Sequence, residues 1–105
     1  MILAETGFNG LFIIKPRVFE DERGYFMETY NRAVFEKTGV HNRWEQDNQS
    51  RSSYGVIRGL HYQINPQAQA KLVRVLEGKI LDVAVDLRKN SNTFGRWYGV
   101  ELSAE

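Results

Sequence analysis

Two residues, His61 and Lys71, have side chains that together could remove a proton next to a carbonyl group. A neutral imidazole is a suitable general base near neutral pH. An ammonium group close to it would stabilise the negative charge that develops on the carbonyl oxygen as the neighbouring carbon loses its proton. The alternative for His61 is a structural or merely exposed role, which is the commoner one for a lone histidine in a strand.

Two strands are expected to bring these side chains together. Residues 59–64 read as one strand and residues 70–77 as the next, and Pro66 lies in the connection, where its missing N–H does no harm. If the chain folds back symmetrically about Pro66, His61 faces Lys71 across the ladder. A slip of one residue would place them on opposite faces.

The segment 70–88 reads as a β-hairpin with its turn at Glu77-Gly78, because Gly78 can adopt the positive φ that a two-residue turn requires. With that turn, Lys71 and Asp82 lie on the same face of the sheet. Asp82 is then the counter-ion of Lys71 in a polar pocket, or half of an ordinary surface ion pair.

Arg58 and a polar stretch further upstream are two more candidates for a binding site. Arg58 lies at an odd separation from His61, so only a bulge at Gly59 would turn both to one face; otherwise Arg58 is a solvated arginine. The stretch 45–51 suits sugar hydroxyls, bases and phosphates, and equally suits water in a polar loop. It contains Gln46, Asp47 and Asn48.

Composition argues against several other classes of site. The chain has no cysteine, which excludes disulfides and thiolate chemistry, and its two histidines are far apart in sequence. No glycine-rich phosphate loop is present. Fourteen basic against thirteen acidic residues give a net charge of +1, without a general attraction to nucleic acid or membranes. We therefore predict no metal site, cofactor, nucleic-acid partner or membrane partner.

The remaining segments indicate a mainly β protein. Strands are expected within 11–19, 24–30, 44–52 and 95–103, and one short helix within 31–40, capped by Asn31 and ended by Gly39. A chain of 105 residues fits a single domain over 1–105, built as a sandwich or open barrel. The amino terminus lacks the pattern of a secretory signal, so we expect a cytoplasmic location.

Four stretches, "RGYFMETY", "WEQDNQSRS", "VIRGLHYQ" and "QAKLVRVLEGKILDVAVDLR", together resemble the dTDP-4-dehydrorhamnose 3,5-epimerase family. The resemblance implies a cupin-type jelly-roll β-sandwich with one short helix. It also implies 3,5-epimerisation of dTDP-4-dehydro-6-deoxy-glucose in dTDP-L-rhamnose biosynthesis, by proton abstraction next to the C4 ketone and without metal or redox cofactor.

The same resemblance assigns roles to individual residues. His61 is implied as the base and Lys71 as the residue near the sugar ketone. The partner would be a second copy, in a homodimer with exchanged amino-terminal strands, so that Arg23 and Glu28 serve the partner's site. The implied positions that bind the dTDP-sugar are Arg23, Glu28, Gln46, Asp47, Asn48 and Arg58.

Family members continue beyond the position of Glu105, and the resemblance places there the tyrosine general acid and the aspartate that orients the base. We therefore expect residues 1–105 to be the amino-terminal part of a cupin-type epimerase domain, incomplete and inactive alone. The alternative is a non-catalytic domain that binds sugar nucleotides or mediates an interaction.

Overall fold

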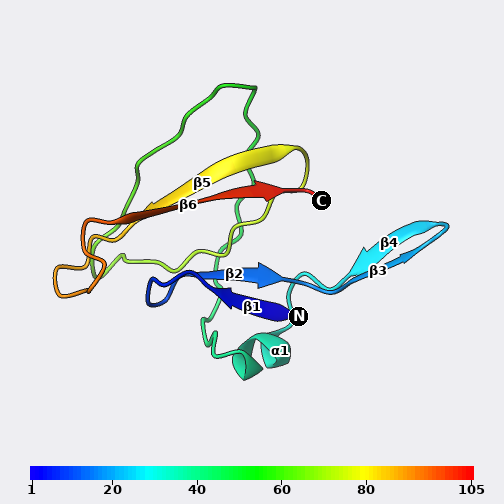
Figure 1. The fold of residues 1–105 in the computed structure, drawn as a ribbon, viewed down its shortest axis with the longest axis horizontal. Helices are drawn as coiled ribbons and strands as arrows, with labels where there is room; N and C mark the ends of the chain where they lie inside the picture. The colour runs from blue at the N-terminus through cyan, green and yellow to red at the C-terminus, as the bar shows by residue number, and fades with distance from the viewer. The chain divides into compact units, whose positions relative to one another are not determined.

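The computed structural model describes residues 1–105 and divides them into two compact units (Figure 1). The first unit consists of Met1–Val40 and Arg74–Glu105, and the second of His41–Val73. Every helix and strand belongs to the first unit, whereas the second, drawn in green in Figure 1, has turns and irregular backbone only. The single-domain organisation stays a prediction.

Strands β1 (Ile2–Glu5) and β2 (Phe12–Lys15) pair antiparallel, with Ile2 opposite Lys15 and Glu5 opposite Phe12. The Thr6 hydroxyl ties their connection together by donating to the Leu11 carbonyl at 2.8 Å. The strand expected within 11–19 is thus divided in two. Pro16 follows β2 directly and has no N–H to continue a ladder, which accounts for the break.

Strands β3 (Val18–Asp21) and β4 (Gly24–Met27) form a second antiparallel hairpin (Figure 1). Asp21 pairs with Gly24, so the turn consists of Glu22 and Arg23. Gly24 has φ of 132°, which only glycine adopts readily.

The predicted helix is confirmed as α1 (Arg32–Lys37). The Asn31 side chain caps it by accepting a hydrogen bond from the Val34 N–H at 3.2 Å, and Gly39 follows the helix with φ of 93°. Phe35 of α1 is the one buried apolar residue. The structure has no helix that could cross a membrane; the cytoplasmic location stays a prediction.

Strands β5 (Lys79–Val85) and β6 (Trp97–Ser103) form the longest hairpin, with Lys79 opposite Ser103 and Val85 opposite Trp97. The hairpin predicted over 70–88 is therefore wrong, because β5 pairs with β6 and residues 70–77 form no strand. The strands predicted within 44–52 and 59–64 are not formed either. Alternating apolar residues located β5 correctly, but the pattern contains no information about the partner strand.

The loop between β5 and β6 is organised by the carboxylate of Asp86, which is almost completely buried. Asp86 accepts hydrogen bonds from the Arg88 backbone N–H and guanidinium and from the hydroxyls of Ser91 and Thr93. Arg88 also donates from Nη1 to the Asn9 carbonyl at 2.7 Å, which ties this loop to the β1–β2 connection.

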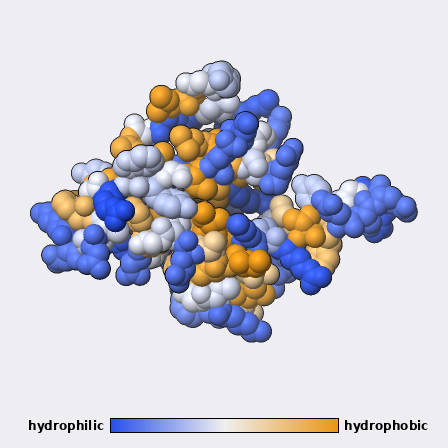
Figure 2. Space-filling model, viewed as in Figure 1, coloured by the Kyte–Doolittle hydropathy of each residue, from blue (hydrophilic) through white to orange (hydrophobic).

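The mainly β architecture exposes much of its apolar surface. The accessible area is 9837 Å², whereas a folded monomer of 12.2 kDa exposes about 6,000 Å². Figure 2 shows hydrophobic residues at the surface of the face in view. The structure has three two-stranded sheets and one buried apolar residue, so most of its apolar side chains remain accessible to solvent.

Candidate functional site

The residues predicted to form a site fall in both units. Arg23 and Glu28 belong to the first unit, and the other six lie in the second. All eight side chains are exposed, so none of them is held by burial.

His61 and Lys71 lie on irregular backbone of the second unit. The predicted turn is confirmed, since the Gln67 N–H donates to the Ile64 carbonyl at 2.8 Å around Pro66. No ladder forms on either side of that turn, so the predicted pairing of His61 with Lys71 across two strands is wrong for this structure. The side chains of His61 and Lys71 make no hydrogen bond and no ion pair. The predicted proton abstraction therefore requires contacts, absent from this structure, that bring the side chains of His61 and Lys71 together.

Arg58 is directed back to residues 51 and 52 of its own unit. Its Nε donates to the Ser52 hydroxyl at 2.9 Å and its Nη2 to the Arg51 carbonyl at 3.2 Å. The bulge predicted at Gly59 is not formed, because a bulge requires a ladder, although Gly59 does have φ of 134°. Arg58 is thus an exposed arginine with one nitrogen, Nη1, left free.

The polar stretch at 46–48 is an exposed loop. Gln46 Nε2 donates to Asn48 Oδ1 at 3.3 Å, which aligns the two amides, while Asp47 makes no hydrogen bond. Amide and carboxylate groups in this state are hydrated and can exchange water for the hydroxyls or the base of a ligand.

Arg23 occupies the tip of the β3–β4 hairpin and is held there by Asp21. Asp21 Oδ1 accepts the Arg23 backbone N–H at 2.8 Å, and Oδ2 accepts Arg23 Nε at 3.1 Å and Nη2 at 2.6 Å. The guanidinium, followed by the backbone N–H, holds the pKa of the Asp21 carboxyl below its usual range. Sequence reasoning missed Asp21, although the spacing Asp-x-Arg in a tight turn was a usable signal.

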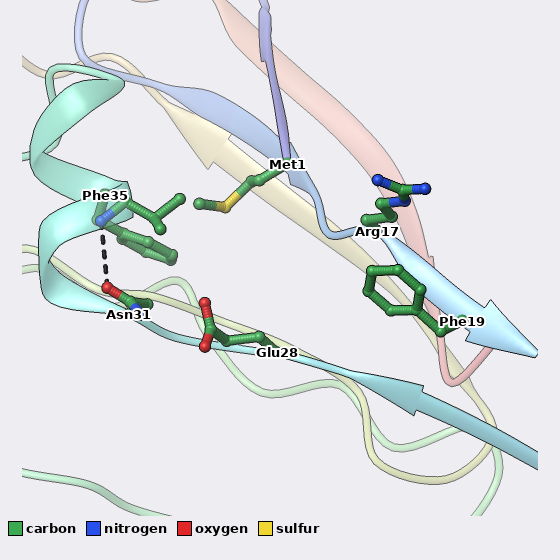
Figure 3. Close-up of a pocket in the computed structure, with 7 residues that line it drawn as sticks. Met1, Arg17, Phe19, Glu28, Asn31 and Phe35 are labelled. Atoms are coloured by element: carbon green, nitrogen blue, oxygen red, sulfur yellow. Dashed lines mark hydrogen bonds between the residues drawn. The ribbon is translucent and has the colours of Figure 1, made fainter.

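Glu28 lies beside a small pocket of about 170 Å³ at the amino-terminal end of α1 (Figure 3). Figure 3 shows its carboxylate facing the space between Asn31 and Phe19, with Met1 across the pocket. Arg17 stacks over the Phe19 ring at 4.7 Å from its centroid. Glu28 forms no ion pair, so its charge is free to interact with a ligand or a partner chain.

No group of three or more histidine, aspartate or glutamate side chains converges anywhere in the structure. A single imidazole or carboxylate at the surface holds a divalent cation weakly, because structural and catalytic sites use three or more such ligands.

Known proteins resemble this chain closely over nearly its whole length. The family model for dTDP-4-dehydrorhamnose 3,5-epimerase matches residues 5–105. An enzyme of that name from Methanothermobacter thermautotrophicus is 57% identical over 96% of this chain and 54% of its own length. The chain thus spans about half the length of this curated relative.

Two solved structures show the same similarity in three dimensions. The dTDP-4-dehydrorhamnose 3,5-epimerase of Bacillus anthracis, with TDP and pyrophosphate bound, has a TM-score of 0.94 at 50% identity, over 98% of this chain and 59% of that one. The dTDP-6-deoxy-D-glucose-3,5-epimerase of Legionella pneumophila, in complex with dTDP-4-keto-L-rhamnose, has a TM-score of 0.91 at 49% identity, over 98% and 55%.

These likenesses confirm the predicted fold class. The chain is mainly β with one short helix, and the solved epimerases that it matches have the cupin-type jelly roll, of which it covers a little more than half. A family model that matches residues 5–105 leaves almost no part of the chain unaccounted for. The chain belongs to the dTDP-4-dehydrorhamnose 3,5-epimerase family.

Proposed function

We propose that this chain supplies the base and part of the substrate site for 3,5-epimerisation of dTDP-4-dehydro-6-deoxy-glucose, in dTDP-L-rhamnose biosynthesis. The observation that carries the proposal is the family match over residues 5–105, which includes all eight predicted site residues. The ligands of the two solved relatives, TDP with pyrophosphate and dTDP-4-keto-L-rhamnose, support the class of substrate.

In the proposed reaction, His61 removes the proton from the carbon next to the C4 ketone. The electron pair of that C–H bond forms an enolate, and the Lys71 ammonium stabilises its oxygen. A proton returned to the opposite face of the same carbon completes the inversion without net oxidation or reduction. The ketone itself acidifies the neighbouring C–H bonds, so this chemistry needs no metal or redox cofactor.

Charged and amide side chains are proposed to bind the nucleotide sugar. Guanidinium groups suit the diphosphate, and the amides suit the base and the sugar hydroxyls. The exposure of these side chains supports the proposal, since each can reach a ligand without breaking a buried contact. The proposed binding residues are Arg23, Glu28, Gln46, Asp47, Asn48 and Arg58.

We further propose a homodimer in which the β3–β4 hairpin reaches the partner's site. All four residues of β3 are exposed, including Phe19, and Phe26 and Tyr25 of β4 are exposed beside them. A two-stranded hairpin with both faces in water is marginal alone, and a second copy that covers it would stabilise it.

The alternative function is a non-catalytic domain that binds sugar nucleotides. Its support is that the side chains of His61 and Lys71 make no hydrogen bond or ion pair that would activate them. We propose that the 105-residue chain alone binds the nucleotide sugar without turning it over.

Deuterium wash-in distinguishes the two functions. In D₂O, a chimera in which the unmatched carboxyl-terminal part of the Methanothermobacter relative follows Glu105 should incorporate deuterium at C3 and C5 of the 4-keto sugar. His61→Ala in the chimera should slow incorporation at least ~100-fold, as expected for loss of a general base. His41→Ala is the matched control and should leave the rate unchanged.

Three results would count against the epimerase proposal. A folded chimera that binds dTDP but exchanges no deuterium would favour the non-catalytic alternative. Retention of most of the rate by His61→Ala would place the base elsewhere. Full turnover by the 105-residue chain alone would refute the proposal that it only binds.

A further inference from the structure

The sequence Asp-x-Arg occurs twice, at Asp21–Arg23 and Asp86–Arg88. In both copies the carboxylate accepts from the same three arginine nitrogens, although Nε donates to Oδ2 of Asp21 and to Oδ1 of Asp86. In each, aspartate Oδ1 accepts the backbone N–H of the arginine, at 2.8 Å and 3.0 Å. In each, the carboxylate also accepts from Nε and from Nη2 of the guanidinium. The aspartate therefore fixes both the turn and the direction of the arginine side chain.

The two copies differ at the remaining nitrogen. Arg88 Nη1 donates to the Asn9 carbonyl, far away in sequence, at 2.7 Å. Arg23 Nη1 has no acceptor, and the Arg23 side chain is 87% exposed. Arg88 thus shows how an aspartate-held arginine can bind a further group: Asp86 holds Nε and Nη2, and Nη1 donates to an oxygen outside the local turn.

The surroundings of Arg23 suit a nucleotide. A hollow of about 390 Å³ lies along the β3–β4 hairpin and is lined by Arg23, the two carboxylates of Glu20 and Asp21, Gly24 and three aromatic residues. Phe19 pairs with Phe26 in the ladder, and Asp21 lies on the same face as Phe19 because it follows two residues later. Aromatic rings beside a guanidinium offer stacking to a base and hydrogen bonds to a phosphate. The aromatic lining residues are Phe19, Tyr25 and Phe26.

We propose that Asp21 is a positioning residue for substrate binding: it holds Arg23 by Nε and Nη2 so that Nη1 is presented to a phosphate oxygen of the nucleotide sugar. The inference rests on the proposed function and adds to it a residue that acts through Arg23. An arginine already held in its binding geometry loses less side-chain freedom when the ligand arrives.

Asp21 has two opposite effects on an anionic ligand. Its negative charge, next to the guanidinium, repels a phosphate, whereas its hydrogen bonds pre-order the arginine. Glu22 is in the same turn and carries the same charge, but it makes no hydrogen bond to Arg23. Asp21 both repels the phosphate and orders Arg23, whereas Glu22 can only repel it. A comparison of substitutions at Asp21 and Glu22 therefore separates the two effects.

The test compares Asp21→Asn with Glu22→Gln in the whole chain by titration calorimetry with dTDP and with thymidine. The Asp21→Asn variant keeps an acceptor for the backbone N–H but loses the charge-assisted bonds to the guanidinium. We expect Asp21→Asn to weaken dTDP binding about 3- to 10-fold, the effect of releasing one long side chain. Glu22→Gln should leave dTDP binding unchanged or slightly tighter, and thymidine binding should be the same in all three proteins.

A second readout tests the pair without ligand. The Arg23 Nε–H signal in ¹⁵N NMR should be protected from exchange with water in the unsubstituted chain and in Glu22→Gln, and lose protection in Asp21→Asn. Equal exchange in all three proteins would overturn the positioning role.

Other outcomes would also overturn the inference. Tighter dTDP binding by Asp21→Asn, as by Glu22→Gln, would show that Asp21 only repels. If Asp21→Asn changes self-association of the chain but not its affinity for dTDP, the acceptor of Arg23 Nη1 would be a carbonyl of a second copy and not a phosphate. If the unsubstituted chain binds neither dTDP nor thymidine, the proposed substrate site fails together with this inference; binding with no effect of Asp21→Asn overturns the inference alone.

Discussion

The two units differ in how their backbone polar groups are satisfied. In the first unit, three antiparallel ladders and α1 pair the N–H and C=O groups that face a partner strand or lie within the helix, while the outer edge of each strand faces water. In His41–Val73, two backbone hydrogen bonds close isolated turns, and water must satisfy the rest. The residues that we propose as base and enolate stabiliser lie in this second, solvated unit.

The difference has a physical cause in the partners of each strand. Every strand of the first unit pairs with a strand that lies near it in sequence, so its ladder forms within the chain. Segments 44–52 and 59–64 have suitable strand sequences but no neighbouring strand. The strand propensity of a residue reflects how well its side chain packs on a half-buried sheet, so a segment without a neighbouring strand gains little stability from it.

The largest effect on the first unit is expected from Phe35→Ala. Phe35 is 2% exposed and packs edge-on against Tyr30 at 4.7 Å between ring centroids. Removing a buried phenyl ring costs about 3–5 kcal/mol. Hydrogen exchange should show faster exchange in α1, where Phe35 lies, and no change in His41–Val73.

Phe26→Ala is the matched control, because Phe26 is 70% exposed. Its effect on the free energy of unfolding should stay within about 0.5 kcal/mol. Equal effects of the two substitutions would mean that Phe35 is not the centre of a core. Faster exchange in His41–Val73 would mean that the two units unfold together.

A smaller and more local effect is expected from Asp86→Asn. The buried carboxylate accepts from Arg88, Ser91 and Thr93, and an amide cannot accept at both positions. Loss of these bonds should speed exchange at the Gly95 and Arg96 amides, which close the loop. Asp21→Asn, at the exposed Asp-x-Arg pair, should leave exchange at the Gly95 and Arg96 amides unchanged. If Asp21→Asn sped exchange at these amides as much as Asp86→Asn, the buried carboxylate of Asp86 would not be what organises the loop.

The same contacts make a prediction about pH. The Arg88 guanidinium, then the Ser91 and Thr93 hydroxyls, hold the pKa of Asp86 far below its ordinary value. A depressed pKa in the folded state stabilises the fold fully above the unfolded pKa; that stabilisation declines as pH falls below the unfolded pKa and is gone below the folded pKa. The carboxyl ¹³C shift of Asp86 should therefore stay constant down to about pH 3, below the usual aspartate pKa of about 3.9. Titration near pH 4 would contradict the hydrogen-bonded state.

The sequence predicted features that depend on residues close together in the chain better than features that depend on contacts between distant segments. The Asn31 cap, the turn at Pro66 and strands β5 and β6 depend on short-range pattern and were predicted. The partner of β5 was not, because the register between strands depends on the whole sheet. The roles of His61 and Lys71 were suggested by residue type and a predicted strand pairing that the structure does not form, and they now depend on the family resemblance.

The smallest effect is expected at the start of α1. Asn31→Ala removes the acceptor of the Val34 N–H, and loss of such a cap costs about 1 kcal/mol. A six-residue helix has few other hydrogen bonds, so the Val34 amide should exchange faster while the β5–β6 amides stay unchanged. Asn31→Asp keeps the acceptor and should restore protection. If the Val34 amide exchanges as fast in Asn31→Asp as in Asn31→Ala, the side-chain cap does not stabilise the first turn of α1. Packing of Phe35 alone would then have to stabilise the helix.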